Sequence, residues 1–259
     1  MTPRDRFSVD EAKFDRFIAF ASGYSRWLRF HVSGLEHVPA DGPALLVGNH
    51  AGLRLHDAWA TAVALRRRHP ARRIVRGLTH RGIAEMPRVA RLQLDYMGAV
   101  IGTPENAKGL LDEGWLVVTY PEGAKSTARP FADRDSVLPL EKWGKGWARL
   151  ALEMNAPVIP VGVAGVETAI PTLWRSKRLG RAFGLQDDLY PIAPQSPLIG
   201  FQPFLTPLLP LPVRCGLSFG PGIMPGERPD DADRLCAFAH GRVQEAIARA
   251  KLREAELTA

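Results

Sequence analysis

The chain has 259 residues, of which 46% are hydrophobic and 24% charged, and its formal net charge is +7 at pH 7. This length fits one large α/β domain, and so high a hydrophobic fraction excludes an intrinsically disordered chain. The two cysteines, Cys215 and Cys236, are too few for a disulfide framework and indicate structural thiols in a reducing compartment.

The first predicted element is a helix over residues 10–32. Phe20 and Trp27 add a second apolar stripe to its main apolar face, and flanking arginines complete a pattern typical of a helix at a membrane interface. Ordinary packing against the body of the protein is the alternative. We therefore expect an N-terminal amphipathic helical segment over residues 1–34 and an α/β domain over residues 35–259. The charged start of the chain does not resemble a signal peptide, which favours a cytoplasmic location.

The rest of the chain alternates between short apolar runs and helical patterns. Strands are predicted at residues 44–49, 72–78, 98–102, 115–120, 157–163 and 214–219, and helices at 57–68, 82–94, 104–112, 142–154 and 230–251. Such alternation predicts an α/β fold with a mostly parallel central sheet and helices on both faces. Ligands of such sheets bind beyond the carboxyl ends of the strands.

The longest uncharged stretch, residues 189–213, is long enough to cross a membrane but contains seven prolines. Because proline interrupts a helix, we predict an apolar surface loop that can touch lipid rather than a membrane span.

Positive charge is concentrated between Arg66 and Arg91, where nine arginines accompany a single acid, Glu85. Such a surface attracts polyanions or anionic membranes, although a solvated charged face is the simpler explanation.

The first candidate site follows the predicted strand at 44–49, where Asn49 and His50 precede Asp57. A neutral imidazole can take a proton from an alcohol near pH 7, and a carboxylate can fix its tautomer and stabilise the imidazolium that forms. His56 is an alternative base, but His50 ends the strand and can face a pocket. A lone His–Asp pair is more often structural than catalytic, so further support is needed.

The chain lacks the motifs of several other reaction classes. It has no Gly-x-Ser-x-Gly elbow, no cysteine near a histidine-rich segment, no metal-binding spacing of His and Cys, and no glycine-rich nucleotide loop. We expect no metal, no nucleic-acid partner and no nucleotide-driven chemistry. A base without an enzyme nucleophile implies that the substrate supplies the nucleophile, as when a hydroxyl attacks an activated carbonyl.

The second candidate site is the run YPEGAKS at residues 120–126, which follows the strand at 115–120. Its acid, glycine and lysine suit a pocket for a polar ligand. Together with the His50–Asp57 block and the run APVIPV at residues 156–161, it resembles the sequence blocks of the glycerolipid acyltransferase superfamily, which includes the 1-acylglycerol-3-phosphate acyltransferases. The resemblance covers roughly residues 35–170.

The resemblance implies a mechanism and a set of partners. His50 would be the general base and Asp57 its orienting carboxylate, and no acyl-enzyme would form. Glu122, Gly123, Lys125 and Ser126 would bind the acceptor head group. Acyl-CoA or acyl-ACP would be the co-substrate, with no other cofactor. A lipid acceptor and an anionic membrane surface, with the protein peripheral on the inner membrane, complete the expected partners.

The sequence departs from the family pattern at three places. Six residues separate His50 from Asp57, more than in the usual block, and Lys125 stands where arginine is usual. The region that matches the second block, residues 98–106, contains no arginine for an acceptor phosphate, although Asn106 is suited to a polyol. The remaining candidate cations are Lys108, Lys125, Arg129 and Lys145, the last at a predicted helix N-terminus.

These departures leave O-acyl transfer better supported than any one acceptor. A non-catalytic lipid or acyl-carrier binding module and a thioesterase are the alternatives.

Overall fold

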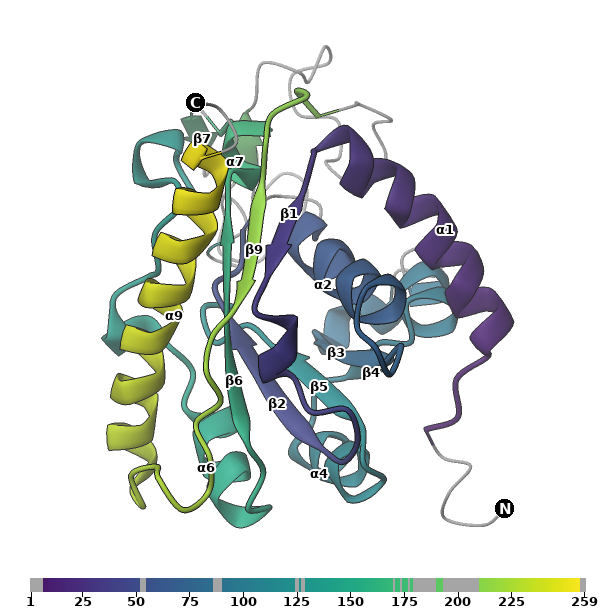
Figure 1. Cartoon of the computed structure of the whole chain (residues 1–259), viewed down its shortest axis with the longest axis vertical. Helices are drawn as coiled ribbons and strands as arrows, with labels where there is room; N and C mark the ends of the chain where they lie inside the picture. Colours follow the sequence, from purple (N-terminus) through teal and green to yellow (C-terminus); the bar gives the residue numbers. More distant parts are fainter. Residues whose placement is uncertain are drawn as a thin grey trace.

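A computed structural model describes residues 7–51, 55–85, 90–123, 126, 129–169, 171–172, 174–176, 178, 190–192 and 210–256. Its centre is a seven-stranded sheet in the order β1-β9-β6-β2-β5-β3-β4 (Figure 1). The strands are β1 (His31–Ser33), β2 (Ala44–Gly48), β3 (Val75–Thr79), β4 (Val100–Ile101), β5 (Leu116–Thr119), β6 (Val158–Ala164) and β9 (Gly216–Phe219). Two further strands, β7 (Trp174–Ser176) and β8 (Tyr190–Ile192), form a separate antiparallel pair.

Strands β6, β2, β5, β3 and β4 run parallel to one another. Strand β9 is antiparallel to β6, and β1 is parallel to β9. The α/β fold with a mostly parallel sheet is therefore confirmed. Because β2 and β5 are parallel neighbours, with Val47 opposite Thr119, the residues that follow them meet at one edge of the sheet.

The helices are α1 (Glu11–Trp27), α2 (His56–Arg67), α4 (Pro104–Asp112), α6 (Gly146–Glu153), α7 (Val166–Ala169) and α9 (Ala232–Glu256). Side chains alternate across each strand, so β2 contributes Leu46 to one core and Leu45 and Val47 to the other. The first core includes residues of α1 and α2, and the second includes residues of α4, α6 and α9. Helices thus cover both faces, as predicted.

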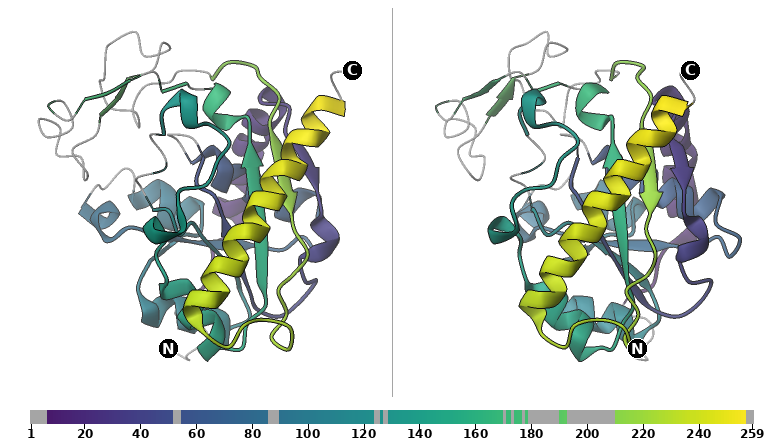
Figure 2. Two further views of the ribbon diagram at one scale, coloured as in Figure 1. Left: turned by 90° about the vertical axis from the view of Figure 1, so that its left-hand side faces the viewer. Right: turned by 60° about the vertical axis from the view of Figure 1, so that its left-hand side comes forward.

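Helix α9 lies along β6 and β9 (Figure 2). A Cβ atom at Gly162 in β6 would come within 2.2 Å of the main chain at Ala246 and Ile247. Glycine is therefore required at this position for α9 to pack so closely against the sheet.

Helix α1 ends earlier than the predicted boundary at residue 32. Leu28 caps it and Arg29 takes a left-handed conformation (φ 42°), after which the chain enters β1 beside β9. Arg66 of α2 binds α1 through Asp15 and Glu11, each at 2.8 Å. Residues 7–34 thus contribute both a strand to the sheet and side chains to its core.

The predicted helix at 82–94 is described only at its two ends, where the structure has a 3-10 helix η3 (Arg81–Glu85) and a π-helix η4 (Arg91–Tyr96). Residues 86–89 lie outside the described residues. Shorter 3-10 turns are η2 (Leu35–His37), η5 (Phe131–Asp133) and η6 (Leu140–Lys142).

Most of the proline-rich stretch 189–213 lies outside the described residues. Where the chain is described again, the indole Nε1 of Trp27 donates to the Pro210 carbonyl at 2.7 Å. Among the described residues, no helix combines the length and the apolar character needed to cross a bilayer.

Candidate active site

The carboxyl end of β2 is fixed by Asn49. Its side-chain Nδ2 donates to the Val163 carbonyl at 2.9 Å, and its Oδ1 accepts from the Val163 N–H at 2.8 Å. The amide thus extends the pairing of β2 with β6 by one buried residue. Because Asn49 directly precedes His50, this clamp sets where the imidazole leaves the sheet.

His50 and Asp57 are in direct contact. The ring Nδ1 of His50 lies 2.5 Å from Oδ2 of Asp57, and the same oxygen accepts the Ala51 N–H at 2.9 Å. Asp57 lies in the first turn of α2, where its Oδ1 accepts the Ala58 N–H at 2.7 Å. A left-handed Leu55 (φ 60°) precedes α2 as its N-cap. Since Nδ1 is engaged by Asp57, Nε2 is left as the proton acceptor of the neutral ring.

The surroundings of His50 alter its proton affinity in opposing directions. Burial alone would lower the pKa of the imidazole, but the charge and hydrogen bond of Asp57, together with the charge of Glu122, raise the pKa overall. The His50 side chain keeps 9% of its surface exposed, whereas that of Asp57 is fully enclosed. The imidazole of this pair therefore keeps a small exposed area, whereas the carboxylate has none.

Tyr120 packs flat against the imidazole of His50. The two ring centroids are 4.5 Å apart and the planes differ by 13°. Burial, followed by the charge of Asp57, raises the pKa of the Tyr120 hydroxyl well above its usual value, so the phenol stays neutral. We did not predict this contact, although an aromatic residue at the first position of the YPEG run was a visible signal.

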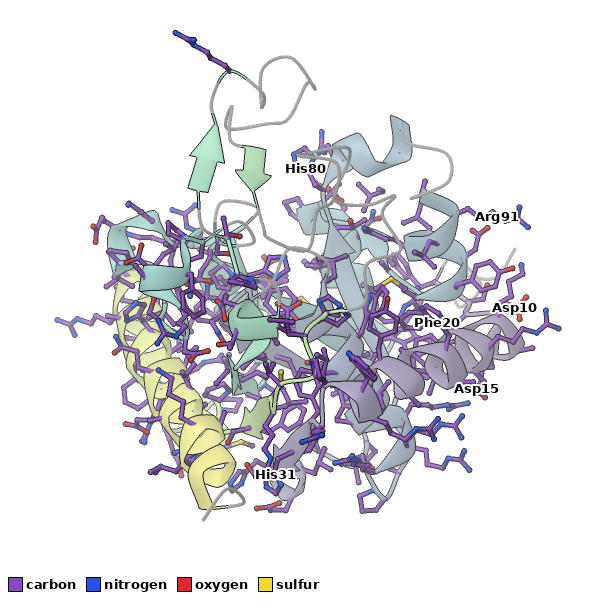
Figure 3. All side chains as sticks on the ribbon, turned by 90° about the horizontal axis from the view of Figure 1, so that it is seen from above. Asp10, Asp15, Phe20, His31, His80 and Arg91 are labelled. Carbon is purple, nitrogen blue, oxygen red and sulfur yellow. The ribbon has the colours of Figure 1, made fainter. Side chains whose placement is uncertain are left out.

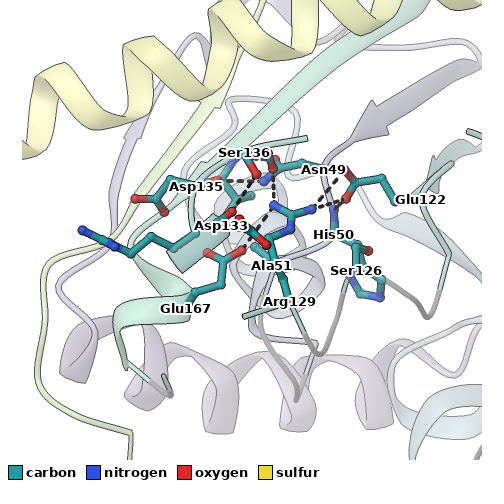
Figure 4. A network of polar contacts seen from close by, with 12 residues as sticks. Asn49, His50, Ala51, Glu122, Ser126, Arg129, Asp133, Asp135, Ser136 and Glu167 are labelled. Atoms are coloured by element: carbon teal, nitrogen blue, oxygen red, sulfur yellow. Dashed lines mark hydrogen bonds and ion pairs between the residues drawn. The ribbon is translucent and has the colours of Figure 1, made fainter. Parts of the chain in front are cut away.

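Glu122 is next to His50 but is oriented differently from the expectation (Figure 4). Its Oε2 accepts the main-chain N–H of His50 at 2.9 Å, and its Oε1 accepts the N–H of Leu138. Arg129 donates to both oxygens, at 3.1 and 3.0 Å. We expected this carboxylate to bind the acceptor head group, whereas in the structure both oxygens bind protein donors and the side chain is fully enclosed.

Two further charged residues complete the buried network in Figure 4. Arg129 donates to the Ser136 carbonyl and lies 3.6 Å from Oε1 of Glu167 in α7. Burial raises the pKa of Glu167 to about 7, although the charge of Arg129 opposes the shift. We had considered Arg129 only as a phosphate ligand. We did not predict a role for Glu167, although its position just beyond the carboxyl end of β6 is where site residues are expected in such a sheet.

The alternative base, His56, has a different environment. Its ring lies 5.7 Å from those of Tyr24 and Trp59, in an aromatic cluster between α2 and α1. It begins α2 and is 2% exposed. The contact with Asp57 therefore favours His50 over His56 as the candidate base.

The other predicted site residues are distributed more widely. Gly123 is exposed and left-handed (φ 62°), which favours glycine in this turn, and the buried Ser126 hydroxyl donates to the Gly123 carbonyl at 2.9 Å. Lys145 is ion-paired with Asp233 of α9 at 2.7 Å. Asn106 donates to the Ile101 carbonyl at 2.9 Å. Lys125 lies outside the described residues.

Within the described part of the chain, no group of three or more His, Cys, Asp or Glu side chains is arranged to hold a metal ion. The site contains two carboxylates that bind His50. The buried carboxylate of Asp57 binds the imidazole, and the carboxylate of Glu122 accepts the main-chain N–H. Such an arrangement can remove a proton from a hydroxyl and later return it to a leaving group.

Comparison with known families gives one match that covers more than half of the chain. The family model described as Acyltransferase matches residues 29–164. An uncharacterized protein of Mycobacterium bovis is 34% identical over 222 residues, which are 83% of this chain and 59% of the relative. The DGAT1/2-independent enzyme synthesizing storage lipids from Bos taurus is 25% identical over 175 residues, 65% of this chain and 48% of that protein. The chain thus spans about three fifths or less of the length of these relatives.

A solved structure shares the fold. The 1-acyl-sn-glycerophosphate (LPA) acyltransferase PlsC from Thermotoga maritima superposes with a TM-score of 0.60 at 17% sequence identity, over 92% of this chain and 80% of that one. The matched family region contains five residues of the candidate site and ends before Glu167; the five are His50, Asp57, Tyr120, Glu122 and Arg129.

Proposed function

The chain belongs to the glycerolipid acyltransferase superfamily, and from this premise we propose that it moves a fatty acyl group from acyl-CoA or acyl-ACP to a hydroxyl of a lysophospholipid or related glycerolipid. The observation that carries the proposal is the 2.5 Å contact between His50 and Asp57 at the end of β2. In a family that acylates hydroxyl groups, this pair supplies the base that the reaction needs.

The reaction follows from the orientation of the imidazole. Nε2 of His50 takes the proton of the acceptor hydroxyl as the hydroxyl oxygen attacks the thioester carbonyl. Asp57, bound to Nδ1, stabilises the imidazolium that forms. The carbon–sulfur bond then breaks, the ester is complete, and the imidazolium returns its proton to the leaving thiolate. The acyl group passes directly to the acceptor, so no acyl-enzyme forms.

The charges around the site bear on the type of acceptor. Of the four cations considered for a phosphate, Arg129 is buried against Glu122 and Glu167, while Lys108 and Lys145 are paired with Glu153 and Asp233. The fourth, Lys125, is not among the described residues. These pairings favour an acceptor recognised through its hydroxyl groups over one recognised through a phosphate dianion. The name of the Bos taurus relative, an enzyme synthesizing storage lipids, is compatible with this class.

Association with a membrane surface would bring the protein to such substrates. On α1, Phe20 is 58% exposed and Trp27 is 42% exposed. Figure 3 shows Phe20 on α1, on the side of the molecule where Arg91 begins η4. Of the arginines in the basic stretch, Arg67, Arg68, Arg72, Arg81 and Arg91 are exposed. The exposed aromatic side chains of α1, with Arg91 on the same side of the molecule as Phe20, support a peripheral site on an anionic membrane.

The proposal is tested with the purified protein and defined lipids. Acyl-CoA and acyl-ACP are each supplied with an acceptor panel that includes 1-acylglycerol-3-phosphate, other lysophospholipids and monoacylglycerol, and mass spectrometry identifies the products. We expect an acylated lipid that depends on both donor and acceptor. Free fatty acid released equally with and without acceptor would replace the proposal with a thioesterase, and an inert thioester would replace it with a binding module.

A further inference from the structure

Arg129 lies buried between two carboxylates beside the base. Its side chain is 2% exposed, and those of its partners Glu122 and Glu167 are fully enclosed and 4% exposed. One guanidinium nitrogen donates to both oxygens of Glu122, and the other donates to the Ser136 carbonyl. With both terminal nitrogens engaged inside the protein, Arg129 is placed to organise the network rather than to bind an external anion.

The effect of Arg129 reaches His50 through Glu122. The oxygen of Glu122 that accepts the His50 N–H at 2.9 Å is also bound by Arg129 at 3.0 Å. The other oxygen is shared by Arg129 and the N–H of Leu138. Four hydrogen bonds from three donor nitrogens thus fix one carboxylate in one orientation, and that carboxylate holds the main chain from which the imidazole projects. Oε1 of Glu167 lies 3.6 Å from the other terminal nitrogen of the guanidinium.

Arg129 and Glu122 also act on the ring electrostatically, in opposite directions. The charge of Glu122 raises the pKa of His50 and the charge of Arg129 lowers it, after the larger effects of burial and of Asp57. Among the described residues, Asp57 from α2 and Tyr120 just after β5 contact the imidazole, whereas Glu122 and Arg129 act on it through their charges.

We infer that Arg129 is a positioning residue for His50, which holds Glu122 on the main chain of the base and opposes the charge of that carboxylate beside the imidazole. This assignment rests on the proposed function, because it takes His50 to be the base. It gives Arg129 a role in the geometry and charge of the site, and none in direct binding of the acceptor.

The inference predicts a signature that loss of structure alone would not produce. The titration of His50 is followed by NMR in the wild type, Arg129→Gln and Glu122→Gln, with His50→Gln to assign the signal. We expect the pKa of His50 to rise in Arg129→Gln and to fall in Glu122→Gln. The combined variant should lie between them. Shifts in the same direction, or no shift in either variant, would overturn the assignment.

A conservative variant separates charge from geometry. Arg129→Lys keeps the positive charge but lacks the planar fork whose two nitrogens bind Glu122 and the Ser136 carbonyl at the same time. We expect its His50 pKa to stay nearer the wild-type value than that of Arg129→Gln, while kcat falls about 10- to 100-fold and KM changes little, since small displacements of a base cost turnover. A wild-type kcat in Arg129→Lys would contradict the positioning role.

The matched control is Arg134→Gln, which removes an exposed arginine from the same loop. Neither its His50 pKa nor its kcat should change. If Arg129→Gln does not fold, Arg129→Lys and Glu122→Gln still give the geometric and the electrostatic results. The NMR titration does not require turnover, so a protein that fails to transfer acyl groups would refute the proposed function while the titration still decides the inference.

Discussion

Asp57 binds both the side chain of His50 and the main chain that follows it. One carboxylate oxygen, Oδ2, lies 2.5 Å from the imidazole Nδ1 and 2.9 Å from the N–H of Ala51. The aspartate therefore fixes the position of the ring as well as its tautomer. This double contact joins His50 and Asp57 although six residues separate them in the sequence.

Replacing Asp57 by Asn should lower kcat by more than about tenfold, because the amide cannot stabilise an imidazolium and favours the wrong tautomer. The comparison is made at saturating acyl thioester and acceptor. Asp95→Asn, which changes an exposed aspartate of η4, serves as the control. Equal turnover in the two variants would show that the buried carboxylate is structural only.

Tyr120 should act through its ring and not through its hydroxyl. The ring stacks on His50, and the raised pKa of the phenol keeps it protonated. We expect Tyr120→Phe to keep kcat within about twofold of the wild type and Tyr120→Leu to lower kcat by about tenfold, because only the second change frees the imidazole to shift. An equal loss in both variants would assign the effect to the hydroxyl.

Glu167 should make the protein less stable as the pH rises. Its pKa is about 7 in the folded state, against an ordinary value of 4.5, so the folded state binds this proton more tightly than the unfolded state. The stability that the protonated form contributes is lost as the pH rises from about 4.5 through 7. The loss amounts to roughly 2–3 kcal/mol between pH 5 and pH 8.

The glutamine in Glu167→Gln does not titrate. The free energy of unfolding of this variant, measured by urea denaturation, should therefore rise relative to that of the wild type by roughly 2–3 kcal/mol between pH 5 and pH 8. Glu153→Gln, which changes an exposed glutamate, should run parallel to the wild type. A constant difference between Glu167→Gln and the wild type across this range would mean that Glu167 is ionised throughout.

Phe20 should contribute to membrane association. Transfer of one phenylalanine side chain from water to an apolar environment is worth about 1.5–3 kcal/mol, so Phe20→Ser should weaken binding to anionic vesicles by about tenfold or more. Sedimentation with vesicles that contain phosphatidylglycerol measures this. Phe238→Ser is the matched control, because Phe238 is 41% exposed on α9. Equal binding by both variants would remove α1 from the membrane contact.

The sequence predicts the bounds of an element well when the residues that determine them are neighbours in the chain. Helix α4 matches its predicted bounds of 104–112 because Thr103 caps it and Pro104 opens it, both local features. Strand β1 was missed because it has only three residues and forms by pairing with β9, far along the chain. The end of α1 was misplaced for the same reason.

The residues of the candidate site likewise differ in how well the sequence predicts their contacts. His50 and Asp57 lie seven residues apart, so spacing and residue type were enough to pair them. The network of Glu122, Arg129 and Glu167 was not predictable from the sequence. Glu167 belongs to α7, which follows β6, and only the fold brings it to Arg129. Composition likewise could not show that Arg76, within the basic stretch, is buried and donates to the carbonyls of Gly98 and Phe7.

The account depends most on His50 as the base, and turnover of purified His50→Ala tests it most directly. Release of free thiol from acyl-CoA is followed with the acceptor that the wild type uses, beside His56→Ala as the neighbouring control. We predict that His50→Ala loses about 10²- to 10⁴-fold in kcat, the usual share of a general base, while His56→Ala keeps most of its activity. Wild-type turnover by folded His50→Ala would contradict the account.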